Sequence, residues 1–257
     1  MTLTSSSSSP CPPLVVVVVV VMATACALAR GFVLEGSPSS YARFPRWPSA
    51  ADADASLTFE FRTDQSDGLL MYTDDGGQTD FFELKLLGGA ARLRMNLGGG
   101  AIALRAGSDL NDFAWHLVEV RRRGALTSLV VDDAPPRSAV VAAVDDGAFG
   151  NATTNSDVFF GGLPRFYHQR LSSLALPSVV FEPHYRGHVR NVVYVTAGGE
   201  GTTVRPRMID SVGLRYNEVD KCEVENLCQH GGLCISTDTG AICSCSFVDY
   251  EGEFCET

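Results

Sequence analysis

The stretch Leu57-Thr58-Phe59-Glu60-Phe61-Arg62 alternates apolar and polar side chains with a period of two residues. Successive side chains of a β-strand point to opposite faces, so this pattern predicts a strand with one buried and one solvated face. Asp67-Gly68 and Asp74-Asp75-Gly76-Gly77, which are turn signals, bracket the apolar run Leu69-Leu70-Met71-Tyr72. The segment therefore predicts two short strands separated by turns.

The same pattern of short β-type runs between Gly, Asp and Asn clusters continues along most of the chain. No long amphipathic helix interrupts it, which favours an all-β fold, an antiparallel β-sandwich of the jelly-roll kind. On one of these runs we expect Trp115, Val118 and Val120 to face the core. The further runs are Phe81 to Leu87, Ala91 to Leu97, Ala101 to Leu104, Trp115 to Arg121, Thr127 to Val131, Val158 to Phe160 and Val189 to Val195.

Residues 1–30 have the pattern of a secretory signal peptide. An apolar run from Leu14 to Met22 is followed by Ala27-Leu28-Ala29, the small-x-small pattern of a cleavage site. The apolar stretch is shorter than the roughly 20 residues of a spanning helix, so we expect cleavage; the alternative is a signal anchor. No later segment is apolar enough to span a bilayer. We expect a chain that is secreted or lies on the extracellular side of a longer single-pass membrane protein.

Composition and charge restrict the classes of partner. The 257 residues, of which 45% are hydrophobic, allow one substantial core and one small further domain. The formal net charge of −10 repels phosphate backbones and anionic headgroups, which argues against binding to nucleic acid or to a membrane surface. Cationic partners, including Ca²⁺, fit this charge better.

Six of the eight cysteines lie in residues 222–257. In an exported chain, an even set in a short segment predicts a disulfide framework rather than a zinc site, and spacing alone leaves about fifteen pairings open. The spacing C-x5-C-x5-C-x8-C-x-C-x9-C, with Gly231-Gly232 and Tyr250-Glu251-Gly252, resembles an EGF-like domain. The resemblance implies the pairs Cys222–Cys234, Cys228–Cys243 and Cys245–Cys255.

The residues around the first cysteine bear on calcium binding by this domain. Calcium-binding EGF-like domains carry Glu or Gln next to the first cysteine, where this chain has Lys221, and Asp or Asn where it has Ser236. We therefore expect this domain to bind no calcium and to act as a spacer or a minor contact surface.

Five motifs in the long cysteine-free region occur in the order found in laminin G-like (LNS) domains. Together with the EGF-like domain, they make the chain resemble the N-terminal part of the α-neurexins. The resemblance implies a signal peptide over 1–30, an LNS domain over 31–217 and an EGF-like domain over 218–257. The motifs are Asp67 to Tyr72, Asp80 to Leu84, Trp115 to Val120, Val158 to Pro164 and Tyr185 to Val189.

Many LNS domains hold one Ca²⁺ at the rim of the sandwich, on oxygen ligands that suit this hard cation. The resemblance assigns it the Asp80 side chain and the Leu97 carbonyl. A second side chain is required, and the candidates are Asn151, Thr153 and Asn155, of which we choose Asn155. The alternative is that Asp80 caps a surface turn.

Two surface motifs bear on glycans. Asn151-Ala152-Thr153 is the N-glycosylation sequon, which predicts a glycan on Asn151 near the proposed calcium rim. Arg121-Arg122-Arg123 would suit a sulfated glycan. Adjacent strand residues point to opposite faces, however, so we favour a solvated strand end.

Catalysis finds no support in the sequence, because the histidines are scattered and no G-x-S-x-G or Walker motif occurs. We expect a non-enzymatic adhesion or receptor module of neurexin type. It would bind extracellular or cell-surface adhesion proteins at cell contacts, including synapses, with Ca²⁺ ordering the rim loops. The alternatives are a basement-membrane protein that binds glycans or dystroglycan, and a spacer without a ligand of its own.

Overall fold

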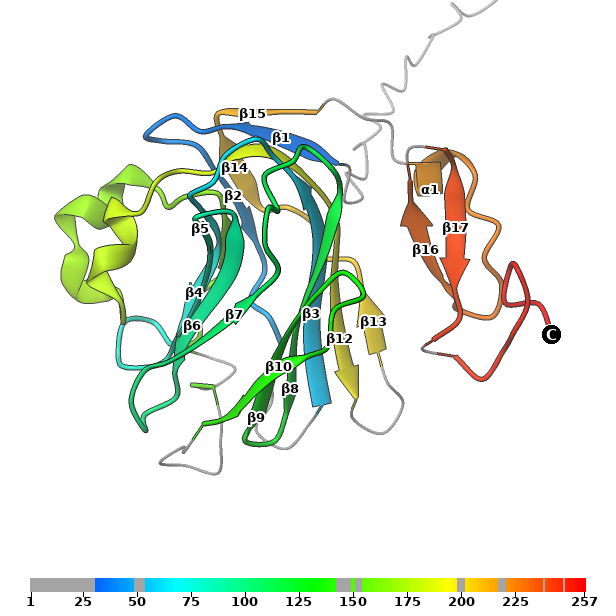
Figure 1. The fold of residues 1–257 in the computed structure, drawn as a ribbon, viewed down its shortest axis with the longest axis horizontal. Helices are drawn as coiled ribbons and strands as arrows, with labels where there is room; N and C mark the ends of the chain where they lie inside the picture. Colours follow the sequence, from blue (N-terminus) through cyan, green and yellow to red (C-terminus); the bar gives the residue numbers. More distant parts are fainter. Residues whose placement is uncertain are drawn as a thin grey trace, which may run out of the picture.

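The computed structural model describes residues 31–48, 54–141, 149–150, 154–197, 202–216, 221–237, 239–246 and 248–257. Two antiparallel sheets pack face to face, and a small disulfide-rich unit follows them, drawn at the right of Figure 1. This confirms the predicted all-β sandwich. The predicted signal peptide lies outside the described residues, and within them no helix is long and apolar enough to cross a membrane.

The first sheet contains the alternating stretch from Leu57 to Arg62. Its order is β10-β9-β8-β3-β12-β1-β15, and β13 pairs with β12. Leu57, Phe59 and Phe61 of β3 are fully buried, as the alternation predicted. The strands are β1 (Phe32–Glu35), β3 (Asp54–Arg62), β8 (His116–Arg123), β9 (Leu126–Val131), β10 (Arg137–Val140), β12 (Arg186–Ala197), β13 (Thr202–Val204) and β15 (Leu214–Arg215).

The second sheet has the order β14-β2-β11-β4-β5-β6-β7. Its strand β4 is buried at every position, so here both faces of the sheet are covered. The strands are β2 (Tyr41–Phe44), β4 (Gly68–Asp74), β5 (Phe81–Leu87), β6 (Ala90–Asn96), β7 (Ile102–Ala106), β11 (Val158–Phe160) and β14 (Asp210–Val212).

A helical lobe covers the outer face of the second sheet. It consists of three 3₁₀ helices, η1 (Arg165–Gln169), η2 (Leu171–Ser173) and η3 (Pro177–Phe181), drawn at the left of Figure 1. A second apolar cluster lies between the lobe and the sheet and is separate from the main core. Its buried members are Leu69, Tyr72, Phe81, Phe159, Leu163, Leu174, Leu176, Val179 and Val180.

Trp115 does not face the core, so that prediction is wrong. Val118 and Val120 are buried, but the residue that shares their face of β8 is His116, because the period is two. Trp115 is half-buried just outside the strand, where the Arg190 guanidinium lies 3.8 Å from the centroid of its ring.

The C-terminal unit consists of a short helix α1 (Lys221–Val224) and a hairpin of β16 (Leu233–Ser236) and β17 (Ala241–Ser244). The structure contains the disulfides Cys222–Cys234, Cys228–Cys243 and Cys245–Cys255, which are the pairs that the resemblance implied. Two of these cysteines, Cys234 and Cys255, are themselves the buried apolar side chains of the described part of the unit. The bridges, each contributing about 2–4 kcal/mol, therefore take the place of a large core.

Candidate metal centre at the sandwich rim

Asp80 and Leu97 lie next to each other where β5 and β6 meet the rim. The two strands pair with Phe81 opposite Asn96. Continuing this antiparallel register by one residue places Asp80, just before β5, opposite Leu97, just after β6. The Leu97 side chain is buried in the main core, so only the backbone of this residue can supply a ligand at the rim.

The Asp80 carboxylate is buried but keeps few hydrogen bonds. Its Oδ2 accepts the Gly150 N–H at 3.2 Å, and its Oδ1 accepts the Thr79 hydroxyl at 3.1 Å. Burial raises the pKa of Asp80, and these two bonds, together with the charge of Arg122, oppose the shift without cancelling it. The desolvation of the charged carboxylate is therefore not fully offset by the surrounding residues, and a bound cation would offset it.

Asn155 is packed against the same Gly150. Its Nδ2 donates to the Phe149 carbonyl at 3.0 Å, while its Oδ1 is buried and accepts no hydrogen bond from any described residue. A Cβ added to Gly150 would collide with this Oδ1, so the amide is packed against the glycine that binds Asp80. A buried amide oxygen without a donor is a suitable ligand for a hard cation.

The adjoining turn is capped by Asp75, not by Asp80. The Asp75 carboxylate accepts the backbone N–H groups of Gln78 at 2.8 Å, of Thr79 at 3.0 Å and of Asp80 at 3.0 Å. Asn96 adds a bond from its amide to the Thr79 carbonyl at 3.1 Å. The local turn is thus satisfied without the Asp80 side chain, which is directed to Gly150 instead.

The structure therefore brings Asp80, Leu97 and Asn155 to one part of the rim. Asn151, with its predicted glycan, and Thr153 lie outside the described residues. Within the described ranges no group of three or more His, Cys, Asp and Glu residues could hold a metal, so a cation here would depend on amide, carbonyl and water oxygens besides one carboxylate. Sequence reasoning missed Gly150, whose role depends on contacts that no local motif encodes.

The basic run of β8 does not form a single cationic patch. Arg122 is 2% exposed, so the prediction of a solvated strand end is wrong for this residue. The side chains of Arg121 and Arg123 are exposed and pair with Glu119 at 2.9 Å and with Asp54 at 3.0 Å. The alternation of the strand directs Arg122 inward, toward the Phe82 ring.

Comparison with known proteins agrees with this architecture. Residues 61–196 match the family model described as laminin G domain. The chain is 41% identical to Neurexin 1 of Drosophila melanogaster over 91% of its own length and 14% of that protein. It is 36% identical to human Neurexin-2 over 89% of its length and 13% of that protein. The chain thus spans only a small part of these relatives.

Solved structures show the same fold at low sequence identity. Domains LG4-5 of the mouse laminin alpha1 chain align with a TM-score of 0.54 and 21% identity, over 73% of this chain and 47% of that one. The LG1-3 region of the laminin alpha2 chain aligns with a TM-score of 0.56 and 19% identity, over 74% of this chain and 35% of that one. At this level of identity the likeness extends to the fold alone.

Proposed function

Because this chain belongs to the laminin G domain family and is neurexin-like in sequence, we propose that it binds adhesion proteins at cell contacts through its rim in a calcium-dependent way. The family supports an extracellular adhesion or receptor module; the calcium dependence and the kind of partner are our proposal. The observation that carries it is that Asp80 and Asn155 both contact Gly150, and that Asp80 lies opposite Leu97 in the β5–β6 register.

Each rim residue has a separate task in this proposal. Asp80 supplies the negative charge, Asn155 supplies an amide oxygen that now has no donor, and Asp75 holds the turn in shape. A bound Ca²⁺ takes about six to eight oxygen ligands, so water or a partner's carboxylate would complete its shell. Loops at the end of a rigid sandwich are suited to recognition, because they can vary without disturbing the core.

We propose recognition of a protein rather than of a sulfated glycan. The paired side chains of Arg121 and Arg123 and the burial of Arg122 provide no basic cluster on β8. The net charge of −10 opposes long-range attraction of a polyanion.

Calorimetric titration of the purified chain with CaCl₂ tests the site. We expect saturable binding at about 10⁻⁴–10⁻³ M, the range of extracellular modules, and its loss in Asp80→Asn, which removes the charge but keeps the shape. The matched control is Asp133→Asn, since Asp133 is an exposed residue of the turn between β9 and β10 in the first sheet, whereas Asp80 adjoins β5 of the second sheet. Unchanged binding in Asp80→Asn, or no saturable heat in the natural chain at millimolar calcium, would overturn the proposal.

A further inference from the structure

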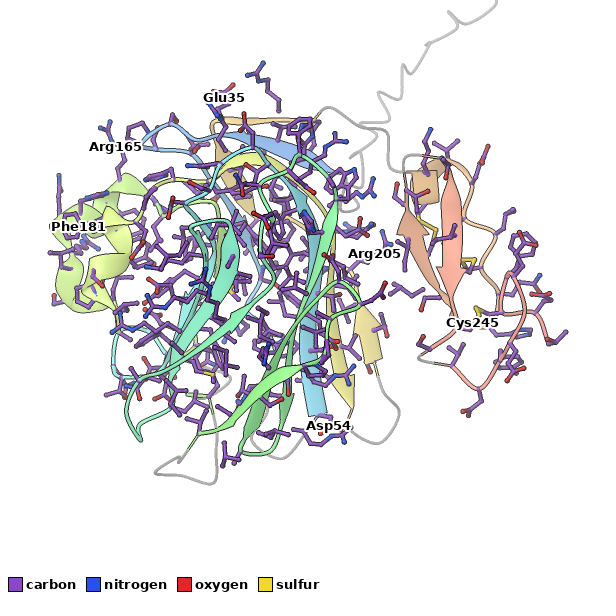
Figure 2. The ribbon with its side chains drawn as sticks, viewed as in Figure 1. Glu35, Asp54, Arg165, Phe181, Arg205 and Cys245 are labelled. Carbon is purple, nitrogen blue, oxygen red and sulfur yellow. A yellow bond between two sulfur atoms is a disulfide. The ribbon has the colours of Figure 1, made fainter. Side chains whose placement is uncertain are left out.

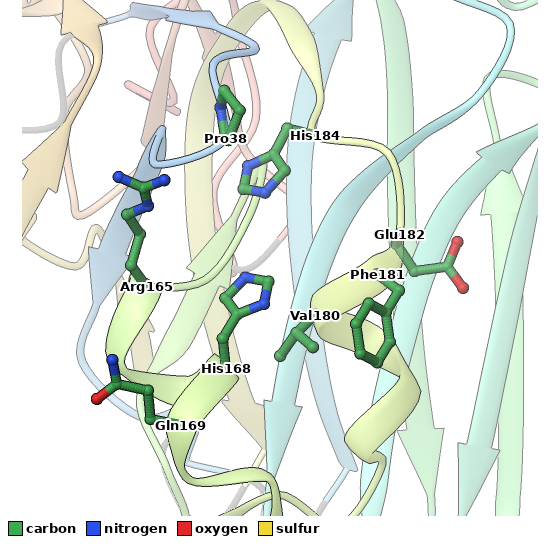
Figure 3. Close-up of a pocket in the computed structure, with 8 residues that line it drawn as sticks. All are labelled: Pro38, Arg165, His168, Gln169, Val180, Phe181, Glu182 and His184. Atoms are coloured by element: carbon green, nitrogen blue, oxygen red, sulfur yellow. The ribbon is translucent and has the colours of Figure 1, made fainter.

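A pocket of about 630 Å³ lies between the helical lobe and the loop that precedes β2 (Figure 3). We call it the Arg165 pocket. Its volume is within the range of sites that hold small ligands or a few side chains. The lining residues that decide its chemistry are Pro38, Arg165, His168, Val180, Phe181 and His184.

The fold positions the His184 side of the pocket firmly. The Leu69 N–H donates to the Pro183 carbonyl at 2.8 Å, which joins this segment to β4. The His184 Nδ1 donates to the Ser40 carbonyl at 3.2 Å. A Cβ at Gly162 would collide with that Nδ1, so the ring occupies space that only a glycine leaves open. The pocket wall is therefore preformed rather than a loose surface loop.

The pocket is cationic although the chain is acidic. The Arg165 side chain is exposed and makes no hydrogen bond or ion pair with a described residue. The rings of His168 and His184 are directed toward the same space (Figure 3). The one acidic lining residue, Glu182, pairs with Lys85, whose Nζ lies 2.5 Å from its Oε1. The guanidinium thus remains the uncompensated charge of the pocket.

An apolar wall stands beside this charge. Phe181 is 73% exposed, and its ring meets the His168 ring edge-on with the centroids 6.1 Å apart. Val180 is buried behind it. Arg165 and Phe181 both lie on the lobe, on the opposite side of the sandwich from the disulfide-rich unit (Figure 2). Aromatic residues and arginine are enriched among the interface residues that contribute most of the binding energy, so an exposed aromatic ring next to an arginine favours a binding surface.

We propose that the Arg165 pocket is a second protein-binding site, which takes a partner segment carrying a carboxylate next to a large apolar side chain. The carboxylate would pair with the Arg165 guanidinium, which can donate two parallel hydrogen bonds to it. The apolar group would pack against Phe181 and Val180. A peptide fits better than a phosphate-bearing or sulfated polymer, since a single arginine on a chain of net charge −10 holds one carboxylate but attracts no polyanion. The site uses neither the rim nor calcium.

The probe for this site is the peptide acetyl-Asp-Leu-Asp-Phe-amide, titrated into the ¹⁵N-labelled full chain and followed by NMR. We expect shift changes concentrated at residues 165–169 and 180–184. The peptide acetyl-Asn-Leu-Asn-Phe-amide has the same shape without charge. It should bind at least about tenfold more weakly, because it lacks one charge-assisted pair. Scattered shifts, no shifts at millimolar peptide, or equal binding of the two peptides would overturn the proposal.

Two variants and one condition distinguish this pocket from a diffuse charge effect and from the calcium rim. Arg165→Gln should weaken binding of the acidic peptide about tenfold, whereas Arg170→Gln, an exposed arginine just after η1, should leave it unchanged. Equal weakening by both would indicate a diffuse charge effect and would contradict the pocket. Binding should persist in EDTA and in Asp80→Asn, so that failure of the calcium proposal and failure of this one are distinguishable.

Discussion

Glu83 lies at the centre of β5 with no exposed surface, and neither carboxylate oxygen accepts a hydrogen bond from a described residue. Lys85 is near, with Nζ 3.7 Å from Oε2, but it is 2.5 Å from Glu182 and so is shared. Burial raises the pKa of Glu83, and the charge of Lys85 opposes this only in part. The folded state therefore binds this proton more tightly than the unfolded state does.

It follows that Glu83 reduces stability at neutral pH. Below its ordinary pKa of 4.5, Glu83 is protonated in both the folded and the unfolded state and costs no stability. As the pH rises from there through the raised pKa of the folded state, ionisation of the buried carboxyl lowers the free energy of unfolding. We expect Glu83→Gln to raise the melting temperature at pH 7.5 by about 2–4 °C, equivalent to about 1 kcal/mol, and to change it little at pH 4. Scanning calorimetry at both pH values measures this, with exposed Glu253→Gln as control. The same gain at both pH values would contradict a charge effect.

Single residues of the candidate site were predictable only where a motif carries them. Asp80 and Leu97 were assigned through the resemblance to laminin G-like domains, and the structure places them side by side at the ends of β5 and β6. Asp75 and Gly150 did not follow, because their roles come from a carboxylate that accepts several N–H groups and from close packing between distant segments. Such contacts depend on tertiary structure, which a local pattern does not record.

At the scale of elements, the strands were predictable and the lobe was not. The alternation in β3 identifies a strand with one buried face, and the structure agrees. In β4 the run of apolar residues predicts a strand, but its burial on both faces depends on η3 and the segment before it. Helices with three residues per turn and only a few residues in length show no periodic pattern, so residues 165–181 carried no signal for the lobe.

Tyr72 joins β4 to this lobe. Its hydroxyl donates to Asp74 Oδ2 at 2.9 Å and accepts the Leu176 N–H at 3.2 Å. The same Asp74 oxygen accepts the Ala175 N–H at 3.2 Å. Burial raises the pKa of Tyr72 far above its ordinary value, so the hydroxyl keeps its proton and its role as a donor at every working pH. Because this network is buried, removing one member leaves others without partners.

We expect Tyr72→Phe to loosen the lobe while the sandwich stays intact. Amide hydrogen exchange at residues 171–181 should become faster by about tenfold or more, since an unsatisfied buried group costs about 1–3 kcal/mol. Exchange in β3 and β12 should not change. Tyr167→Phe is the matched control, because the Tyr167 hydroxyl makes no hydrogen bond with a described residue. Equal effects of the two variants, or none, would show that the network does not hold the lobe.

At the scale of the whole molecule, the predicted boundary between the two units falls at 217–218, among residues outside the described ranges. Among the described residues, one contact between the units lies at a bulge in β12. There Asn191 has a φ of +53° and the register with β3 shifts between Arg190 and Val193. Asn tolerates this left-handed backbone better than most residues, and the bulge turns its side chain toward β16.

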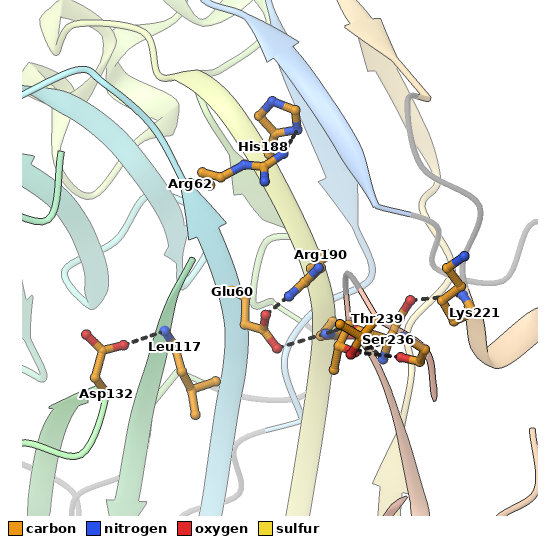
Figure 4. A network of polar contacts seen from close by, with 12 residues as sticks. Glu60, Arg62, Leu117, Asp132, His188, Arg190, Lys221, Ser236 and Thr239 are labelled. Carbon is orange, nitrogen blue, oxygen red and sulfur yellow. Dashed lines mark hydrogen bonds and ion pairs between the residues drawn. The ribbon is translucent and has the colours of Figure 1, made fainter. Parts of the chain in front are cut away.

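Asn191 holds the disulfide-rich unit through the backbone of Ser236; Figure 4 labels Ser236, Glu60 and Arg190 of this network. The Asn191 Nδ2 donates to the Ser236 carbonyl at 2.9 Å, and its Oδ1 accepts the Ser236 N–H at 3.2 Å, so the amide imitates a strand neighbour. Its Nδ2 also donates to Glu60 at 2.8 Å, and Glu60 in turn pairs with Arg190 at 2.8 Å. The Ser236 hydroxyl accepts the Lys221 N–H at 2.9 Å. Ser236, one of the two positions that argued against calcium binding, therefore docks the unit through its backbone, while its hydroxyl joins α1 to β16 within the unit.

We expect Asn191→Gly to release this unit without unfolding either part, because glycine keeps the left-handed backbone while the amide is lost. The ¹⁵N relaxation of residues 221–257 should then report a shorter rotational correlation time than that of the sandwich, whereas the natural chain should show one common time. Ser236→Ala is the control, since it removes the hydroxyl but keeps the backbone groups that Asn191 binds. If Asn191→Gly tumbles as one body, or if Ser236→Ala separates the two units equally, Asn191 does not hold them together.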